Sequence, residues 1–209
     1  MQPVVGQELT GRLTGTVDGK RSDRRVGGEI RHLRGEAMRE DLTISWCNDP
    51  RRARELADFF ARHVGPAYIS HSELQGPRAL SPVQWHDRLP DILREEMEPR
   101  LAQSGGVAPG RTSQPILVAE SGGAVVGLSF VTFDGNAGVP FAIIEDLIVD
   151  PSRRSQGIGK AILDWIAAEA RTREVRRLFL ESGVQNERAH HFFEQEGFQT
   201  VSVVMMRSL

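Results

Sequence analysis

The feature that most constrains the fold is an apolar strand pattern followed at once by a glycine-rich loop and an amphipathic helix pattern. The segment FAIIEDLIVD (residues 141–150) is apolar apart from its acids, and PSRRSQGIGK (151–160) follows it directly. Behind the loop, apolar side chains recur at helical spacing at Ile158, Ile162, Trp165, Ile166 and Ala170. A strand that runs through a short loop into a helix predicts a layered fold of the mixed α/β class.

Shorter patterns on both sides of this unit extend the prediction. Further strands are expected at residues 42–46, 116–120, 124–134, 176–182 (short and buried) and, as the last strand or strands, 198–209. Further helices are expected at residues 51–65, 81–104 (interrupted by Pro90 and Pro99) and 186–197. Helices and strands therefore mix along the whole of this part of the chain.

Composition limits the kind of protein and its partners. The 209 residues are 39% hydrophobic and 26% charged, which is typical of one soluble globular domain. The formal net charge of −2 gives no global basic field for nucleic acid, and no apolar run is long enough to cross a membrane. The single cysteine, Cys47, excludes an intrachain disulfide and a cysteine metal cluster. We expect a cytoplasmic protein without a metal, a nucleic-acid partner or a membrane partner.

The first 40 residues differ in composition from the rest. They mix glycine, arginine and acidic residues with few large apolar side chains. We therefore expect residues 1–40 to be a flexible or weakly structured extension and residues 41–209 to be the functional domain.

The glycine-rich loop has the properties of an anion site. A helix N-terminus carries unpaired N–H groups and the positive end of the helix dipole, and Gly157 and Gly159 would let the backbone approach a phosphate closely. Arg154 and Lys160 add positive charge. Alternatively, the glycines only turn the strand into the helix. A Walker A loop is excluded because Ala161 follows the lysine, and a dinucleotide fingerprint fails because residue 162 is isoleucine.

Two motifs together resemble one known family. The pattern Arg154-x-x-Gly157-x-Gly159 follows a strand, and NERAHHFFEQEGF (186–198) is similar to a segment Asn-x-x-Ala-x-x-Phe-Tyr-x-x-x-Gly-Phe. Both resemble the GNAT superfamily of N-acetyltransferases, although Phe193 stands where that family usually has tyrosine. The resemblance covers roughly residues 41–209. It implies a mostly antiparallel, twisted sheet of six to seven strands, splayed at an acetyl-coenzyme A (acetyl-CoA) site and flanked by helices.

The same resemblance implies direct transfer of an acetyl group from acetyl-CoA, a cosubstrate, to an amine. The loop N–H groups would hold the pyrophosphate, and the end of the strand would pair with the pantetheine arm and polarise the thioester carbonyl. The residues expected to bind acetyl-CoA are Leu147, Ile148, Val149, Arg154, Gln156, Gly157, Ile158, Gly159, Lys160, Asn186 and Phe193.

Proton transfer needs a base, and Glu145 is the candidate because it matches a glutamate position of several family members. Since side chains alternate along a strand, Asp146 is expected on the opposite face. Phe193 has no proton to give the departing thiolate. His190 could donate that proton instead, or Tyr68 could donate it from the acceptor side. Alternatively, the thiolate could leave without a dedicated acid.

The acceptor is open at this point. A small-molecule amine is favoured because residues 65–104 are a long segment with apolar and aromatic residues that could close a pocket. The alternatives are a protein amine, a longer acyl donor, and a coenzyme A-binding module that has lost turnover. The family often dimerises, so a homodimer is a further expectation.

Overall fold

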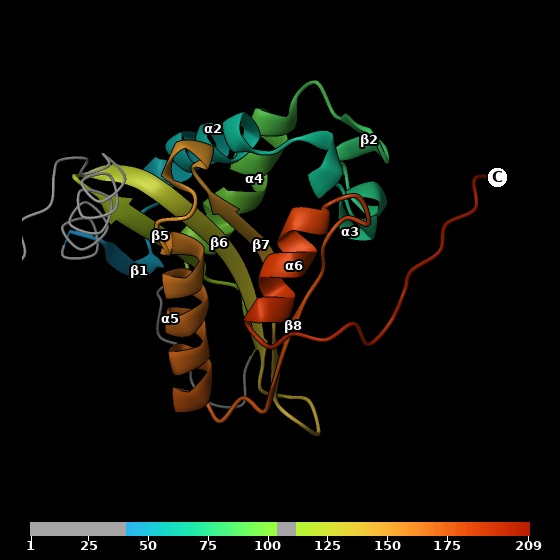
Figure 1. Cartoon of the computed structure of the whole chain (residues 1–209). Helices are drawn as coiled ribbons and strands as arrows, with labels where there is room; N and C mark the ends of the chain where they lie inside the picture. The colour runs from blue at the N-terminus through green and yellow to red at the C-terminus, as the bar shows by residue number, and fades with distance from the viewer. Residues whose placement is uncertain (1–40, 104–111) are drawn as a thin grey trace, which may run out of the picture.

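A twisted sheet of six strands forms the centre of the molecule (Figure 1). The computed structural model describes residues 41–103 and 112–209, so the expectation for residues 1–40 lies outside the described residues. The strands are β1 Thr43–Cys47, β4 Thr112–Ser113, β5 Ile116–Ser121, β6 Ala124–Asp134, β7 Phe141–Val149 and β8 Arg177–Leu180. Their order is β1-β5-β6-β7-β8, with β4 paired to β6, and every pair is antiparallel except β7 with β8. The predicted mixed α/β class with a mostly antiparallel sheet is confirmed.

Helices cover both faces of this sheet. One face is covered by α2 (Ala53–His63) and α4 (Leu89–Leu101), and the other by α5 (Ile158–Thr172) and α6 (Glu187–Gln195). The smaller elements are the 3₁₀ turns η1 Pro50–Arg52, η2 Pro66–Tyr68 and η3 Pro151–Arg153, the helix α3 His71–Gln75, and the hairpin of β2 Ala79–Ser81 with β3 Gln84–Trp85. No helix in the described part of the chain is both long and apolar enough to span a membrane.

Strand β5 shows why the apolar runs of the sequence fold this way. Ile116 and Val118 pack into the core beneath α2 and α4, whereas Leu117 and Ala119 pack into the core beneath α5. All of these side chains are buried because both faces of the strand are covered. Burying one such large aliphatic side chain contributes about 1.5–3 kcal/mol.

The predicted helix over residues 81–104 begins later than expected. Residues 79–85 form the β2–β3 hairpin, and α4 begins at Leu89 with Pro90 in its first turn. Proline fits there because the N–H that it lacks would have no acceptor within the helix. Pro99 lies inside the last turn and does not end the helix before Leu101. The prolines therefore mark the two ends of one helix and do not interrupt a longer one.

The prediction of a last strand within residues 198–209 is wrong. Residues 199–209 form no strand, and Figure 1 shows this segment leading away from the body of the protein. Val201, Val203 and Met205 are 78%, 81% and 92% exposed. The β-branched residues of this segment favour an extended chain, but a strand also needs a partner strand. The parallel strand β8 is likewise an edge strand with alternating exposure, and it is not buried as predicted.

Close packing of α5 on β6 depends on a glycine. A Cβ atom on Gly127 would lie 2.6 Å from Cδ1 of Ile162 and 3.2 Å from Cβ of Ala119. We expect Gly127→Ala to lower the free energy of unfolding by about 1–3 kcal/mol through overpacking. Ile162→Val removes the Cδ1 atom, so the double variant should lose clearly less than the sum of the two single variants. Urea unfolding measures all of these.

Gly138→Ala is the matched control, because a Cβ atom there meets nothing within 4 Å. It should leave the unfolding midpoint nearly unchanged. Strict additivity of Gly127→Ala and Ile162→Val would contradict the packing described for α5.

Candidate functional site

The central feature of the site is a gap where two parallel strands separate. Strand β7 pairs with β8 only from Phe141 to Ile144 and then continues to Val149 without it. Within residues 41–103 and 112–209, the main chain of this second half of β7 therefore has no strand beside it on the β8 side. A small cavity of about 30 Å³ lies in the gap, and its lining includes Leu147, Asn186 and Phe193.

A short segment before α3 spans this gap. The N–H of Leu147 donates a hydrogen bond to the hydroxyl of Tyr68 at 3.1 Å, where a neighbouring strand would otherwise accept it. At the other side of the gap, a Cβ atom on Gly183 would collide with the carbonyl oxygens of Ala67 and Ile69. Residues 66–69 therefore lie directly against both β7 and the connection between β8 and α6.

The loop between β7 and α5 has the backbone geometry of an anion site. Ser155 and Gly157 adopt positive φ angles of 63° and 81°, and α5 begins directly after Gly157 without a side-chain cap. The first helical N–H groups, at Ile158, Gly159 and Lys160, therefore have no acceptor within the helix. Their direction and the helix dipole favour an anion.

The two flanking features of this loop are a second glycine and a lysine. A Cβ atom on Gly159 would lie 3.3 Å from Cζ of Phe192, so glycine lets α6 pack beside α5. The Lys160 ammonium bonds to Glu196 at 2.7 Å and to Asp164 at 3.3 Å, and these hydrogen bonds raise the pKa of Lys160. The lysine side chain thus connects α5 to α6, whereas its N–H remains at the helix start.

The gap beside the second half of β7 forms a groove that leads to the loop before α5. The structure brings most of the predicted binding residues to this groove and loop. Leu147, Ile148 and Val149 form the end of β7, and the loop residues from Gln156 to Lys160 follow at the start of α5. Arg154 is exposed immediately before them. His190 differs: it is half-buried on α6 and is not part of the lining of either cavity described here.

A β-bulge changes the expected direction of the two acids. The register between β6 and β7 shifts there, since Phe130 is opposite Asp146 and Val131 is opposite Ile144, which leaves Glu145 as the extra residue. The prediction that Glu145 and Asp146 lie on opposite faces is therefore wrong. Both carboxylates line the same cavity of about 390 Å³.

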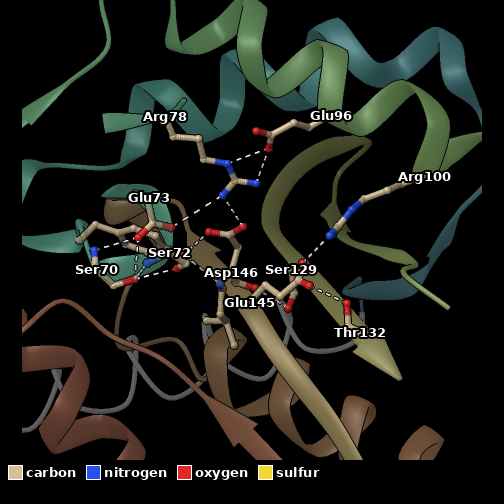
Figure 2. A network of polar contacts seen from close by, with 12 residues as sticks. Ser70, Ser72, Glu73, Arg78, Glu96, Arg100, Ser129, Thr132, Glu145 and Asp146 are labelled. Atoms are coloured by element: carbon tan, nitrogen blue, oxygen red, sulfur yellow. Dashed lines mark hydrogen bonds and ion pairs between the residues drawn. The ribbon is translucent and has the colours of Figure 1, made fainter. Parts of the chain in front are cut away.

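The bulged Glu145 uses both carboxylate oxygens, as Figure 2 shows. Thr132 donates its hydroxyl to Oε1 at 2.5 Å, and Nη2 of Arg100 donates to Oε2 at 2.5 Å. Arg100 belongs to α4 and packs over the ring of Phe130 at 5.2 Å. Glu145 is thus held between the sheet and the helix layer.

Asp146 is fully buried and lies between an arginine and a tyrosine. Nη1 of Arg78 donates to Oδ2 at 2.9 Å, and the hydroxyl of Tyr68 donates to Oδ1 at 3.0 Å. Burial raises the pKa of Asp146 above its ordinary 3.8, and the charge of Arg78 opposes that rise only in part. Burial also raises the pKa of Tyr68 well above its ordinary value, and Asp146 raises it further.

Arg78 is itself fixed from several sides. Its Nε and Nη2 atoms donate to Glu96 at 2.7 and 2.6 Å (Figure 2). Its guanidinium lies over the rings of Phe60 and Phe130 at 5.6 and 5.5 Å. Glu73 adds a longer contact at 3.8 Å. This guanidinium, held by Glu96 and the two aromatic rings, fixes the position of the Asp146 carboxylate.

Arg78, Arg100, Glu73 and Glu96 carry no motif, and the sequence analysis missed them. The signal was the pair of acids in an otherwise apolar strand, because buried carboxylates require cationic or hydrogen-bonding partners. That signal predicts that partners exist but does not give their positions along the chain.

The larger cavity is acidic. Its lining includes five carboxylates, which belong to Glu73, Glu96, Glu145, Asp146 and Glu181. Arg78 and His71 are the basic residues among the described lining. Its neighbour, the small cavity in the gap between β7 and β8, shares Glu73, Glu145 and Glu181 with it. The two cavities therefore meet at the bulge of β7.

Three features define the class of the site: two parallel strands that separate, a helix start with the backbone geometry of an anion site, and an acidic cavity beside them. Comparison with family models gives a match of residues 78–198 to the Acetyltransferase (GNAT) family. The chain belongs to this family, and the resemblance inferred from the two sequence motifs is confirmed.

A curated relative is the IAA acetyltransferase of Azospirillum brasilense, which is 32% identical over 82 residues. The match covers 39% of this chain and 52% of the relative, so it spans about half the length of that protein.

Several solved structures share the fold. A transcriptional regulator from Bacillus halodurans C-125 has a TM-score of 0.58 at 20% identity, over 80% of this chain and 99% of that one. A ribosomal-protein-alanine N-acetyltransferase from Brucella melitensis biovar Abortus 2308 has a TM-score of 0.53 at 18% identity, over 80% and 99%. An aminoglycoside N-acetyltransferase in complex with CoA has a TM-score of 0.56 at 13% identity, over 80% and 94%. Identities this low show a common fold alone.

The raised pKa of Asp146 predicts a pH dependence with a definite sign. A carboxyl whose folded pKa lies above 3.8 stabilises the fold most below that pH, and this stabilisation is lost as the pH rises through the folded pKa. The free energy of unfolding of the wild type minus that of Asp146→Asn should therefore fall with rising pH above 3.8 and then level off. Urea unfolding from about pH 4 to pH 8 measures this difference.

Asp91→Asn is the control of opposite sign. Hydrogen bonding to Arg54 lowers the pKa of this exposed carboxyl, so its contribution is lost as the pH falls through its folded pKa. A wild-type-minus-variant difference that rises with pH for Asp146→Asn would show that Arg78 outweighs burial.

Proposed function

We propose that the protein is an acetyl-CoA-dependent N-acetyltransferase that transfers the acetyl group directly to an amine of a small cationic molecule. The observation that carries this proposal is the separation of β7 from β8 directly before a loop whose left-handed Gly157 starts α5. Within the described residues, the end of β7 offers main chain that no strand pairs with on the β8 side, and α5 offers N–H groups without an acceptor inside the helix. Membership of the GNAT acetyltransferase family and the CoA complex of a protein with the same fold support it.

The residues of the groove and loop fit acetyl-CoA. Unpaired N–H groups at the start of α5, from Ile158 to Lys160, suit the pyrophosphate, with Gln156 and Arg154 beside them. The main chain of Leu147, Ile148 and Val149 suits the extended pantetheine arm, and Asn186 and Phe193 line the cavity at the gap together with Leu147. The bound thioester supplies an activated acetyl group, whose carbonyl would accept a hydrogen bond from an N–H group at the end of β7.

The acceptor amine must lose a proton, because amines are largely protonated near neutral pH. Glu145 is the base that the sequence analysis proposed, and it lines both cavities. Both of its oxygens already accept hydrogen bonds from Thr132 and Arg100. Glu145 would have to exchange one of these bonds to accept a proton.

The acidic cavity supports a cationic small molecule as the acceptor. Its volume of about 390 Å³ lies in the range of small-molecule sites. Its carboxylates outnumber its basic groups among the described residues, so it favours an acceptor with a positive charge in addition to the reacting amine. Diamines, polyamines and aminoglycosides have this chemistry.

Release of free thiol from acetyl-CoA tests the proposed function. The wild type is assayed with n-butylamine, 1,4-diaminobutane, spermidine, tobramycin and a lysine-containing peptide. Amine-dependent thiol release with an acetylated product in the mass spectrum is the expected result. Binding of acetyl-CoA without release of thiol for any amine would instead indicate a coenzyme A-binding module. Phenylalanine at position 193, where the family usually has tyrosine, favours this alternative. Release with the peptide alone would indicate a protein-amine acetyltransferase.

Charge recognition gives a sharper prediction with two amines of equal carbon number. We expect a lower KM for 1,4-diaminobutane than for n-butylamine, since the second ammonium group faces the acidic wall. Glu181→Gln should raise the KM of the diamine by roughly two- to fivefold, the range of one partly exposed ion pair, and leave that of butylamine unchanged.

Glu95→Gln is the matched control, because Glu95 is exposed on α4 and does not line the cavity. Equal KM values for the two amines would contradict a cationic acceptor without affecting the assignment of acetyl transfer.

The glycine at the start of α5 predicts a loss of cofactor affinity. Gly157→Ala places a Cβ on a residue with φ of 81°, so the loop must distort and its N–H groups must turn. We expect the Kd of acetyl-CoA, measured by calorimetry, to rise about tenfold, which corresponds to about 1.4 kcal/mol.

Gly123→Ala introduces a Cβ at a similar φ of 76°, in the turn between β5 and β6. It should lower the stability comparably but leave the Kd unchanged. An unchanged Kd in Gly157→Ala would remove the loop from the binding site.

A further inference from the structure

The hydroxyl of Tyr68 joins the two cavities of the site. Tyr68 lines the small cavity at the gap together with Phe193. Asp146, to which it donates a hydrogen bond, lines the large acidic cavity. Tyr68 is the only tyrosine in the sequence, and it comes from η2, a segment with no motif.

The direction of the hydrogen bonds around Tyr68 is fixed. Its oxygen accepts from the N–H of Leu147 at 3.1 Å, so its own proton points to Oδ1 of Asp146 at 3.0 Å. Oδ2 of Asp146 is bound to Arg78 at 2.9 Å. The pair is therefore an ordered donor–acceptor chain from the groove to a buried carboxylate.

The position of Tyr68 relative to the reaction follows from the proposed function, on which this inference rests. The N–H groups at the end of β7 are the candidates for polarising the thioester carbonyl, and in the structure the N–H of Leu147 is bound to Tyr68. A carbonyl oxygen that accepts from this N–H must lie beside the Tyr68 oxygen. An amine that attacks this carbonyl carbon then comes within reach of the Tyr68 oxygen, one of whose acceptor directions becomes free.

We propose that Tyr68 and Asp146 form a proton relay that serves both ends of acetyl transfer. The acceptor reacts as the neutral amine, after its ammonium form has released one proton to solvent. As the amine nitrogen bonds to the carbonyl carbon, one of its N–H protons passes to the Tyr68 oxygen, and the Tyr68 proton passes to the Asp146 carboxylate. When the carbon–sulfur bond breaks, the electron pair leaves on sulfur, and the relay runs backwards to protonate the thiolate. The products are the amide and the free thiol, and both residues return to their starting state.

The surroundings of the relay suit both steps. Burial raises the pKa of Asp146, which makes it a better proton acceptor than an exposed aspartate, yet the neutral acid can still protonate a thiolate whose pKa is near 8.5. The raised pKa of Tyr68 keeps the phenol neutral between the steps. The charged groups that face Asp146 are Arg78 and Glu73, with Glu96 beyond Arg78 and Glu145 adjacent in β7.

The relay also accounts for phenylalanine at position 193. A proton donor for the thiolate is needed inside the cavity that Phe193 lines, and the Tyr68 hydroxyl lies in the same cavity. Glu145, whose oxygens are bound to Thr132 and Arg100, remains as part of the anionic wall that attracts the acceptor.

Tyr68→Phe tests the relay, with 1,4-diaminobutane and spermidine as the amines and thiol release as the readout. We expect kcat near pH 7 to fall about 100-fold, within the range of general acid–base catalysis, with the Kd of acetyl-CoA within about twofold of wild type. The deficit should shrink towards about pH 10, where hydroxide can take the proton of the amine and a thiolate with a pKa near 8.5 can leave without being protonated. A structural defect would lower the rate equally at every pH.

Ser129→Ala is the matched control. Its hydroxyl donates to the main-chain carbonyl of Asp146 at 2.7 Å, so the variant removes a buried hydrogen bond on the same residue without touching the relay. It should lower the unfolding midpoint but leave kcat and its pH profile within about twofold of wild type.

The outcomes separate this inference from the proposed function. Full activity of Tyr68→Phe, or a deficit that is the same at every pH, overturns the relay while the wild type still acetylates amines. If Glu145→Gln abolishes turnover and Tyr68→Phe does not, Glu145 is the base and the relay is overturned. A wild type that releases no thiol with any amine overturns both the proposed function and the relay.

Discussion

The contact between Arg78 and the buried Asp146 is the interaction on which the rest of the site depends. A carboxylate with no exposed side-chain surface is unstable unless it is paired, and removing one partner of such a pair typically costs about 3–5 kcal/mol. Arg78 supplies that charge from the segment between α3 and β2, and it is held there by Glu96 of α4. The pair therefore fastens the helical layer to the sheet at the point where β7 is bulged.

The bulge and the strand separation have complementary consequences. The extra residue at Glu145 turns two successive carboxylates into one cavity, and the end of pairing at Ile144 frees the main chain that follows. The acidic cavity proposed for the acceptor and the groove proposed for the donor are therefore adjacent along a few residues of one strand. Tyr68 lies between them and contacts both sides.

Much of the fold could be predicted from the sequence because its signals are local. The apolar runs at β5, β6 and β7 and the helical spacing in α5 each reflect burial, and the loop before α5 reflects a backbone that only glycine adopts easily. The prediction for residues 198–209 was wrong because strand propensity is local but strand pairing is not. The prediction that Asp146 opposes Glu145 was wrong because a bulge depends on the register with β6, which no pattern within β7 encodes.

The site divides in the same way. Its glycine loop and the Asn186–Phe193 segment were recognisable as motifs, but Arg78, Arg100 and Tyr68 lie in segments without one. They reach the bulge through tertiary packing, because each lies between 45 and 79 positions along the chain from its partner in β7. The acidic character of the larger cavity likewise comes from four separate segments, namely α3, α4, β7 and the β8–α6 connection, and only the fold brings them together.

A crystal structure of the protein with acetyl-CoA, grown without an amine, would show directly whether the donor occupies the gap beside β7 and the start of α5. The account predicts the pyrophosphate at the N–H groups of Ile158, Gly159 and Lys160. It also predicts the acyl oxygen on the N–H of Leu147 in place of Tyr68, with Tyr68 still bonded to Asp146. Acetyl-CoA bound elsewhere, or bound with the Leu147 N–H still donating to Tyr68 and the thioester distant from it, would contradict the account.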